Sequence, residues 1–333
     1  MTAKSILSNL KSGQYAPIYL LHGEEPYYID LITEYIEDHV LEEAEKAFNQ
    51  AVLYGKDVDF KQVVDEARQF PMMASHRVII IKEAQDMKTL TKLEKYAENP
   101  SPQSIVVLAY KHKKIDGRTK LAKNISKKGI LFESKKIYDN QLPGWITDAC
   151  KGKKVSIDFE ASVMLAEYLG TDLSKVSNEI NKLLLNVKSN KITLADVQEQ
   201  VGISKEYNVF EFQKALGTRN REKAFRIIEY FSDNVKSNPL PLILGNLYNY
   251  YSKLYITIHH LKSSDQQIQK LIGLPSPYFV GEYKSAAKNM GFTRIKSAFL
   301  ALQRADLQSK GVGARSKDNK AILTELGLSL LYD

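Results

Sequence analysis

The sequence is poor in cysteine, since Cys150 is the only one among 333 residues. A single thiol excludes internal disulfides and cysteine-rich metal sites, and it is typical of the reducing cytoplasm. Long apolar segments are also missing: the longest runs, "VIII" and "IVVLAY", are far too short to span a bilayer. The first residues, "MTAKSILSNLKSG", lack the apolar core of a signal peptide and predict a short amphipathic helix that ends at Gly13. We therefore expect a cytoplasmic protein with no membrane partner.

No phosphate-binding P-loop is present. The stretch "IYLLHGEEPYYIDL" predicts a buried strand that stops at Gly23 and leads into a helix, which is where many α/β proteins bind a nucleotide. A P-loop needs several glycines, a lysine and a hydroxyl, whereas this turn has one glycine, a proline, and the carboxylates of Glu24 and Glu25. These carboxylates would repel a triphosphate but suit the positive end of the helix dipole, and they are equally explained as ordinary acidic residues of a first turn.

Other catalytic patterns are absent too. The strand "VIIIKEAQD" places Lys82 before Glu83 and lacks the paired acids of an ATPase, and the tripeptide Ser-Arg-Cys occurs nowhere. There is no G-x-S-x-G, and the histidines form no metal-spaced cluster; they are His22, His39, His76, His112, His259 and His260. The sequence therefore predicts no catalytic residue, no metal site and no cofactor.

What is present is an ordinary globular composition, with 44% hydrophobic and 26% charged residues. The net charge of +8 favours a polyanionic partner. The length suits two or three domains. Apolar strands are expected at 16–23, 77–84, 104–110 and 129–136, and helices between them at 27–45, 60–70, 88–98 and 117–127. This alternation predicts a parallel sheet covered on both faces, in an α/β domain over residues 1–138.

After "FESKKIYDNQLPGWI" no further strand is expected. Helices are predicted at about 141–150, 158–168, 173–187 and 193–200, with Thr171 and Asp172 as capping candidates for the third. From Asn208 onward longer helical segments follow one another. The fold class is thus α/β plus all-α, with a small helical domain at 139–207 and a larger one at 208–333.

Six stretches occur in an order that resembles a known family. They are "YLLHGEEPYYID", "RQFPMMASHRVIIIKEA", "KKIDGRTKLAKNISKKG", "YLGTDLSKVSNEINKLLL", "NVFEFQKALGTRN" and "ADLQSKG". Together they are similar to the delta subunit of the bacterial DNA polymerase III clamp loader, over essentially the whole chain.

The resemblance implies an AAA+-like N-terminal domain, a small helical lid domain and a C-terminal helical collar that joins subunits into a ring. It implies a non-catalytic subunit of the polymerase holoenzyme that binds and opens the sliding clamp, so that the clamp can be loaded on primed DNA during replication. The implied partners are the sliding clamp (beta), the gamma/tau ATPase subunits, delta-prime and primed DNA, and the isolated chain would be a monomer. The alternatives are a degenerate AAA+ ATPase and a stand-alone basic DNA-binding protein.

The family's clamp-binding element corresponds to "FPMMASHR". The resemblance places the contact at Met72 and Met73, with Phe70 beside them; many relatives carry a Leu-Phe pair instead, a difference that bears on the strength of the contact. From the residues alone, Pro71 should end a helix near Gln69, and two consecutive large apolar residues cannot share one face of an extended segment. The alternative is that all three side chains pack under the sheet.

The segment "KHKKIDGRTKLAKNISKK" at 111–128 is strongly basic. Its cations spread around more than one helix face, which favours a solvated helix; the alternative is that they contact DNA phosphates, with Lys135 and Lys136 extending the patch. Tyr278 and Phe279 in "LPSPYFVGEYK" could stack on a base, but core packing is the favoured interpretation. The possible DNA contacts are Lys113, Lys114, Arg118, Lys120, Lys123, Tyr278 and Phe279.

Overall fold

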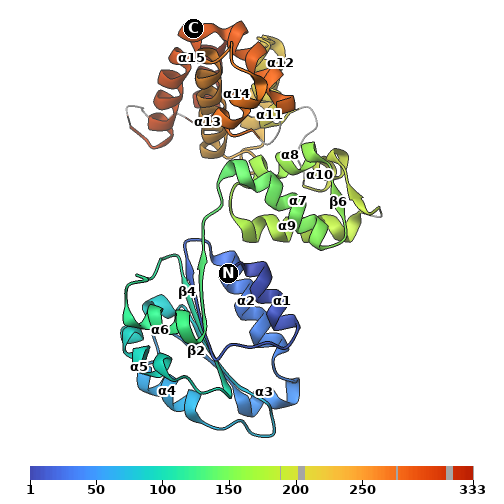
Figure 1. The fold of residues 1–333 in the computed structure, drawn as a ribbon. Helices are drawn as coiled ribbons and strands as arrows, with labels where there is room; N and C mark the ends of the chain where they lie inside the picture. The colour runs from blue at the N-terminus through green and yellow to red at the C-terminus, as the bar shows by residue number, and fades with distance from the viewer. Residues whose placement is uncertain (188, 202–206, 275–276, 313–317, 333) are drawn as a thin grey trace. The chain divides into compact units, whose positions relative to one another are not determined.

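The computed structural model of the chain describes residues 1–187, 189–201, 207–274, 277–312 and 318–332 (Figure 1). The chain divides into two compact units, Met1–Ile137 and Tyr138–Asp333. The expected three-way division, with boundaries at 138 and 207, stays a prediction.

The first unit is built on a five-stranded sheet in the order β2-β3-β4-β1-β5, in which every neighbouring pair is parallel. The strands are β1 (Ile18–Gly23), β2 (Gln50–Tyr54), β3 (Arg77–Lys82), β4 (Ser104–Lys111) and β5 (Ile130–Ser134). The α-helices are α1 (Ala3–Lys11), α2 (Pro26–His39), α3 (Glu43–Asn49), α4 (Phe60–Arg68), α5 (Glu94–Glu98) and α6 (Lys120–Lys128), with 3₁₀ turns η1 (Ala84–Asp86) and η2 (Leu90–Leu93). This confirms the parallel α/β fold that the sequence predicts.

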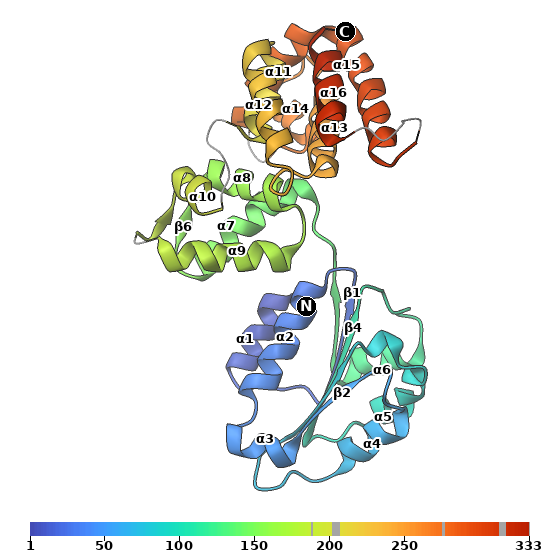
Figure 2. The same cartoon turned by 180° about the vertical axis from the view of Figure 1, so that it is seen from behind.

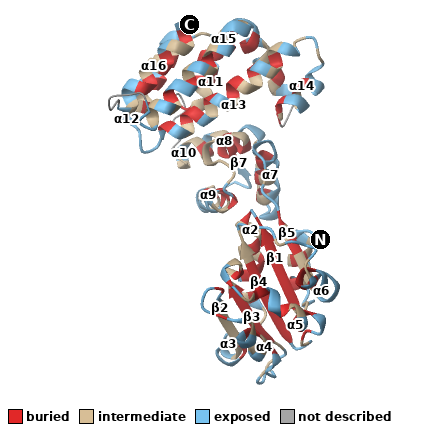
Figure 3. Cartoon of the chain, turned by 90° about the vertical axis from the view of Figure 1, so that its left-hand side faces the viewer, coloured by how far each residue is buried: buried red, intermediate tan, exposed pale blue. Residues whose placement is uncertain are grey.

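Both faces of the sheet are buried, because alternate residues of each central strand pack against helices on opposite sides. On one face Leu20, Ile79 and Val106 join the buried residues of α4, α5 and α6. On the other face Leu21 and Ile80 meet α1 and α2. Figure 3 shows the central strands coloured as buried. Near-continuous apolar runs such as "VIII" follow from this double coverage.

Two expectations for this unit were wrong in detail. The strand β2 was not foreseen, because it is a short edge strand whose residues are only half-buried or exposed. The helix expected at 27–45 is two helices, since Glu42 starts α3 with a capping box to Glu45.

The second unit is mainly helical (Figure 2). Its α-helices are α7 (Leu142–Gly152), α8 (Phe159–Leu169), α9 (Leu173–Asn186), α10 (Leu194–Gln200), α11 (Val209–Gly217), α12 (Arg221–Asp233), α13 (Leu240–His259), α14 (Asp265–Ile272), α15 (Val280–Ser309) and α16 (Asn319–Tyr332), and its 3₁₀ turns are η3 (Asp139–Gln141) and η4 (Pro277–Phe279). Asp172 caps α9 as predicted, by accepting a hydrogen bond from the Lys175 amide. Helix α15 is interrupted at Gly291, whose φ of 72° is non-helical.

The expectation that strands cease after the first unit was wrong. Ser156–Ile157 (β6) and Lys191–Ile192 (β7) form a small parallel pair. Two-residue strands leave no periodic signal in a sequence, which explains why they were missed. The large helices α11, α12, α13, α15 and α16 share one apolar core.

Candidate functional site

The turn between β1 and α2 is closed by the chain's own backbone. The Gly23 amide donates a hydrogen bond to the Lys113 carbonyl at 2.9 Å, and the Glu25 amide donates one to the Ser134 carbonyl at 3.3 Å. Gly23 has a φ of 136°, and a Cβ there would lie 2.0 Å from the Ser134 oxygen, so only glycine fits. Two amide groups of this turn are therefore already paired and are not available to a phosphate.

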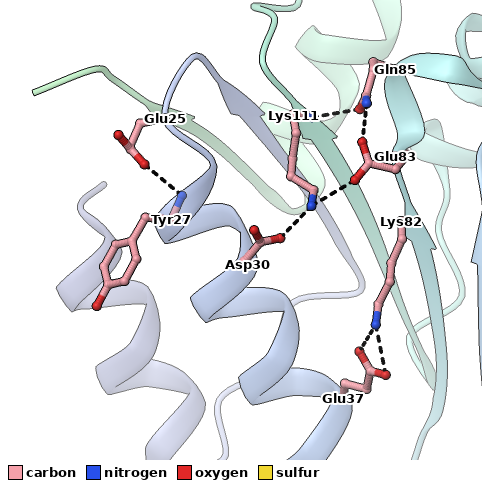
Figure 4. Close-up of polar contacts among 8 residues, drawn as sticks. All are labelled: Glu25, Tyr27, Asp30, Glu37, Lys82, Glu83, Gln85 and Lys111. Carbon is pink, nitrogen blue, oxygen red and sulfur yellow. Dashed lines mark hydrogen bonds and ion pairs between the residues drawn. The ribbon is translucent and has the colours of Figure 1, made fainter. Parts of the chain in front are cut away.

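The N-terminus of α2 is likewise occupied by protein groups. Glu25 is its N-cap, and its Oε1 accepts a hydrogen bond from the Tyr27 amide at 3.0 Å (Figure 4). This carboxylate is buried, with 6% of the residue exposed, and it places negative charge at the positive end of the helix dipole. Pro26 contributes no amide hydrogen. An incoming phosphate would have to displace a buried carboxylate of like charge.

An ion-pair cluster lies where β3 and β4 end. The Lys111 ammonium contacts Asp30 Oδ1 at 3.0 Å and Glu83 Oε1 at 2.9 Å (Figure 4). Gln85 donates to the Glu83 carboxylate, and its Oε1 accepts from the Lys111 amide at 2.9 Å. Nearby, Lys82 contacts Glu37 at 2.8 Å. We name Asp30, Glu83, Gln85 and Lys111 the Lys111 cluster.

The cluster shifts the pKa values of its members. Burial lowers the pKa of Lys111, but the bonds to Glu83 and Asp30 outweigh burial, so the net shift is upward. For Glu83 burial raises the pKa, and hydrogen bonds from Lys111 and Gln85 more than reverse this. Both groups are therefore held in their charged forms. Glu83, the carboxylate that directly follows β3, is therefore neutralised by Lys111.

The segment between α4 and β3 presents apolar side chains to solvent. Helix α4 ends at Arg68 with Gln69 as its C-cap, as Pro71 predicts. The exposed fractions of Phe70, Met72 and Met73 are 79%, 61% and 100%. The alternative that these side chains pack under the sheet is therefore wrong. Because the strands of the sheet are parallel, this segment lies at the edge where the strands begin. Gly23 and the Lys111 cluster lie at the opposite edge, where the strands end.

Two buried side chains join this segment to the end of α3. Asn49 accepts from the Met72 amide at 2.7 Å and donates to the Met72 carbonyl at 2.9 Å. Arg77 donates to the Phe48 carbonyl at 2.7 Å and to the Glu66 carbonyl at 2.9 Å, and it forms an ion pair with the Glu66 carboxylate. Phe48 itself is 62% exposed. Sequence reasoning missed these residues, because their roles depend on contacts between distant parts of the chain.

The cations of the basic segment are exposed, apart from Lys111. Lys113, Lys114, Lys120 and Lys123 all reach solvent, as do Lys135 and Lys136, while the apolar residues of α6 face the sheet. Lys114 contacts Glu133 at 3.0 Å. Arg118 pairs with Asp116 at 2.8 Å, and this hydrogen bond lowers the pKa of Asp116 to about 2. A solvated helix and a DNA-contacting surface are both compatible with this arrangement.

The two aromatic candidates differ in their surroundings. Tyr278 is 78% exposed, so the favoured packing interpretation was wrong for it. Phe279 is half-buried and packs against Phe159, with ring centroids 5.4 Å apart. The packing interpretation is therefore confirmed for Phe279 but not for Tyr278.

Within the ranges that the structure describes, no group of three or more His, Cys, Asp or Glu side chains is arranged to hold a metal ion. In the same ranges, no helix combines the length and apolarity needed to cross a membrane.

Comparison with known proteins shows which family the α/β unit resembles. Residues 19–135 match the family model described as "DNA polymerase III, delta subunit". Over these residues the chain is similar to the DNA polymerase III delta subunit family. DNA polymerase III subunit delta of Bacillus subtilis is 29% identical over 248 residues, which are 71% of this chain and 71% of that protein. A probable delta subunit of Aquifex aeolicus is 24% identical over 309 residues, or 88% of this chain and 86% of the relative.

A solved delta-family structure shares the fold. The Bacillus subtilis DNA clamp loader delta protein superposes with a TM-score of 0.59 and 24% identity, covering 100% of both chains. At this identity the likeness supports the fold, a mixed α/β chain with a five-stranded parallel sheet and many helices. The expected fold class and delta-family resemblance are thus confirmed.

Proposed function

We propose that this chain is the non-catalytic delta subunit of a DNA polymerase III clamp loader, and that it binds and opens the sliding clamp through Met72 and Met73. The observation that carries this proposal is the exposure of two consecutive methionines, with Phe70, on a loop that is hydrogen-bonded to Asn49 at the end of α3. Large apolar side chains held in solvent are typical of a protein-binding site. Methionine suits such a site because it is flexible and polarizable.

The size of the apolar contact fits its proposed role. Burying two methionine side chains contributes roughly 3–6 kcal/mol before the loss of freedom on association is subtracted. This amount alone corresponds to a weak complex, so Phe70 and the exposed Phe48 would widen the contact. Tight binding requires such a wider surface.

We infer a non-catalytic role from the opposite edge of the sheet. There the amides of Gly23 and Glu25 are paired with carbonyls of the chain, and Lys111 balances Glu83. These features argue against the alternative of a degenerate ATPase. Titration with Mg-ATP by calorimetry separates the two functions: the delta role predicts no heat of binding, whereas a degenerate ATPase would release or absorb heat at a defined stoichiometry.

The proposed role implies the remaining partners. The gamma/tau ATPase subunits and delta-prime would join the helical residues 208–333 in a ring, with residues 139–207 as the lid domain, and the complex would act on primed DNA. The chain alone would be a monomer, and its location would be the cytoplasm, where replication occurs. A stand-alone DNA-binding protein, the second alternative, would bind DNA tightly but not the clamp.

The variant Met72→Ala/Met73→Ala tests the clamp contact. We expect its affinity for the cognate clamp to fall by at least about 100-fold, since the roughly 3–6 kcal/mol from burying the two methionine side chains is lost. Its circular dichroism and thermal midpoint should be unchanged, because both side chains are exposed. The matched control is Leu185→Ala/Leu300→Ala, which removes two exposed leucines from the helical unit, 85% and 62% exposed. Undiminished clamp binding by the methionine variant would refute the assignment.

A further inference from the structure

Asn49 makes an unusual set of hydrogen bonds for a residue at the end of a helix. It is the last residue of α3, and its side chain is fully buried. The amide oxygen accepts from the Met72 amide, and the amide nitrogen donates to the carbonyls of Met72 and Glu45, at 2.7, 2.9 and 3.0 Å. One side chain thus pairs both backbone polar groups of a residue 23 positions later.

Besides Asn49, the contacts that hold the segment carrying Met72 lie at its end, where Ala74 packs against the core and the His76 ring packs edge-on against Tyr15. The segment has no regular secondary structure between Gln69 and Arg77. The side chains of Phe70, Met72 and Met73 are exposed, so burial does not hold them. Met73 also has a φ of 54°, in the left-handed region that non-glycine residues seldom occupy. A backbone in this state persists only where neighbouring groups stabilise it.

We propose that Asn49 is a positioning residue for the clamp contact, which fixes the backbone of Met72 so that Met72 and Met73 are displayed in their binding conformation before the clamp arrives. The proposal rests on the proposed function of this pair. A loop that is ordered in advance loses less conformational freedom on association and binds more tightly. Arg77 holds the end of α3 next to β3, whereas Asn49 acts on the methionine backbone itself.

Hydrogen exchange and clamp affinity together test this role. In the free wild-type protein, the Met72 amide should be protected. In Asn49→Ala, exchange over residues 70–76 should accelerate at least about tenfold, and clamp affinity should fall by roughly tenfold. Asn49→Asp keeps an acceptor for the Met72 amide but turns a buried carboxylate oxygen toward the carbonyls of Met72 and Glu45, so it should weaken clamp binding at least as much as Asn49→Ala. The matched control is Asn124→Ala, which removes a 3.0 Å bond from a side-chain amide to the Glu94 carbonyl, away from the loop.

Each result of these measurements either supports or overturns the positioning role of Asn49. Unchanged clamp affinity in a folded Asn49→Ala variant with accelerated exchange would overturn the positioning role. If Asn49→Ala does not fold, the wild-type measurement remains, and a Met72 amide that exchanges at the rate of an unprotected loop amide would overturn the positioning role as well. If Met72→Ala/Met73→Ala binds the clamp normally, the proposed function fails and the positioning role with it, even where exchange shows that Asn49 orders the loop.

Discussion

Replacing Lys111 by methionine should destabilise the α/β unit measurably. The Lys111 side chain is only 18% exposed and contacts two carboxylates, those of Asp30 and Glu83, at 3.0 and 2.9 Å. The variant leaves these two negative charges near each other without a cation. Because both carboxylates still reach solvent, the loss should lie between that of a surface pair and that of a buried pair, at about 1–3 kcal/mol.

The pH dependence of this loss follows from the shifted pKa values. The lowered pKa of Glu83 gives a stabilisation that is present above its unfolded pKa and is lost as pH falls through the folded value. The raised pKa of Lys111 gives a second stabilisation. It is present below the pKa of Lys111 in the unfolded chain and is lost as pH rises through its pKa in the folded protein. The difference between wild type and variant should thus be constant from about pH 6 to pH 9 and shrink below about pH 4 and above about pH 10.5.

Urea unfolding followed by circular dichroism, with hydrogen exchange of peptides from β1 and β4, measures this effect. The control is Arg118→Met, since Arg118 is 90% exposed and its pair with Asp116 lies at the surface. This control should leave the unfolding midpoint unchanged. A Lys111→Met midpoint equal to that of the control, or a loss that persists undiminished at pH 3, would refute the stabilising role of the Lys111 cluster.

Three further predictions concern other parts of the chain. Gly23→Ala should destabilise the α/β unit by about 2 kcal/mol or more, because its Cβ would meet the Ser134 carbonyl at 2.0 Å; a wild-type unfolding midpoint would contradict this. Cys150 is buried, which raises its pKa to about 11, so it should react with a thiol reagent only after unfolding in urea; rapid labelling at pH 8 would contradict this. Exchanging Lys113, Lys120 and Lys123 for alanine should weaken binding to primed DNA and reduce the slope of log affinity against log salt by about 2–3; an unchanged slope would favour the solvated-helix interpretation.

Local patterns in the sequence were sufficient for the parallel sheet and for the end of α4, whereas the exposure of Met72 and Met73 required the structure. Fully buried strands such as β3 have continuous apolar runs, and Pro71 marks the end of α4. The edge strand β2 was missed because it is short and half-buried, so its sequence carries no clear period. The packing expected for Tyr278 failed because a short aromatic stretch does not reveal which of its rings faces the core.

The residues that fix the candidate site could not be predicted in the same way. Asn49 acts on Met72 across 23 positions, and Arg77 reaches Phe48 across 29. Their roles arise only once α3, β2 and β3 are adjacent, and that adjacency depends on an edge strand that leaves a weak signal. The turn at Gly23 is a mixed case: its sequence indicated poor phosphate binding, but its pairing with Lys113 and Ser134 required the fold.

Hydrogen exchange of the chain with and without its cognate clamp tests the central claim most directly, because it locates the contact on the protein. We predict that clamp binding protects residues 69–76 and the end of α3, while the β1–α2 turn at residues 23–30 is unchanged. Protection of residues 23–30 without protection of 69–76, or no protection in either segment on a clamp-saturated sample, would contradict the account.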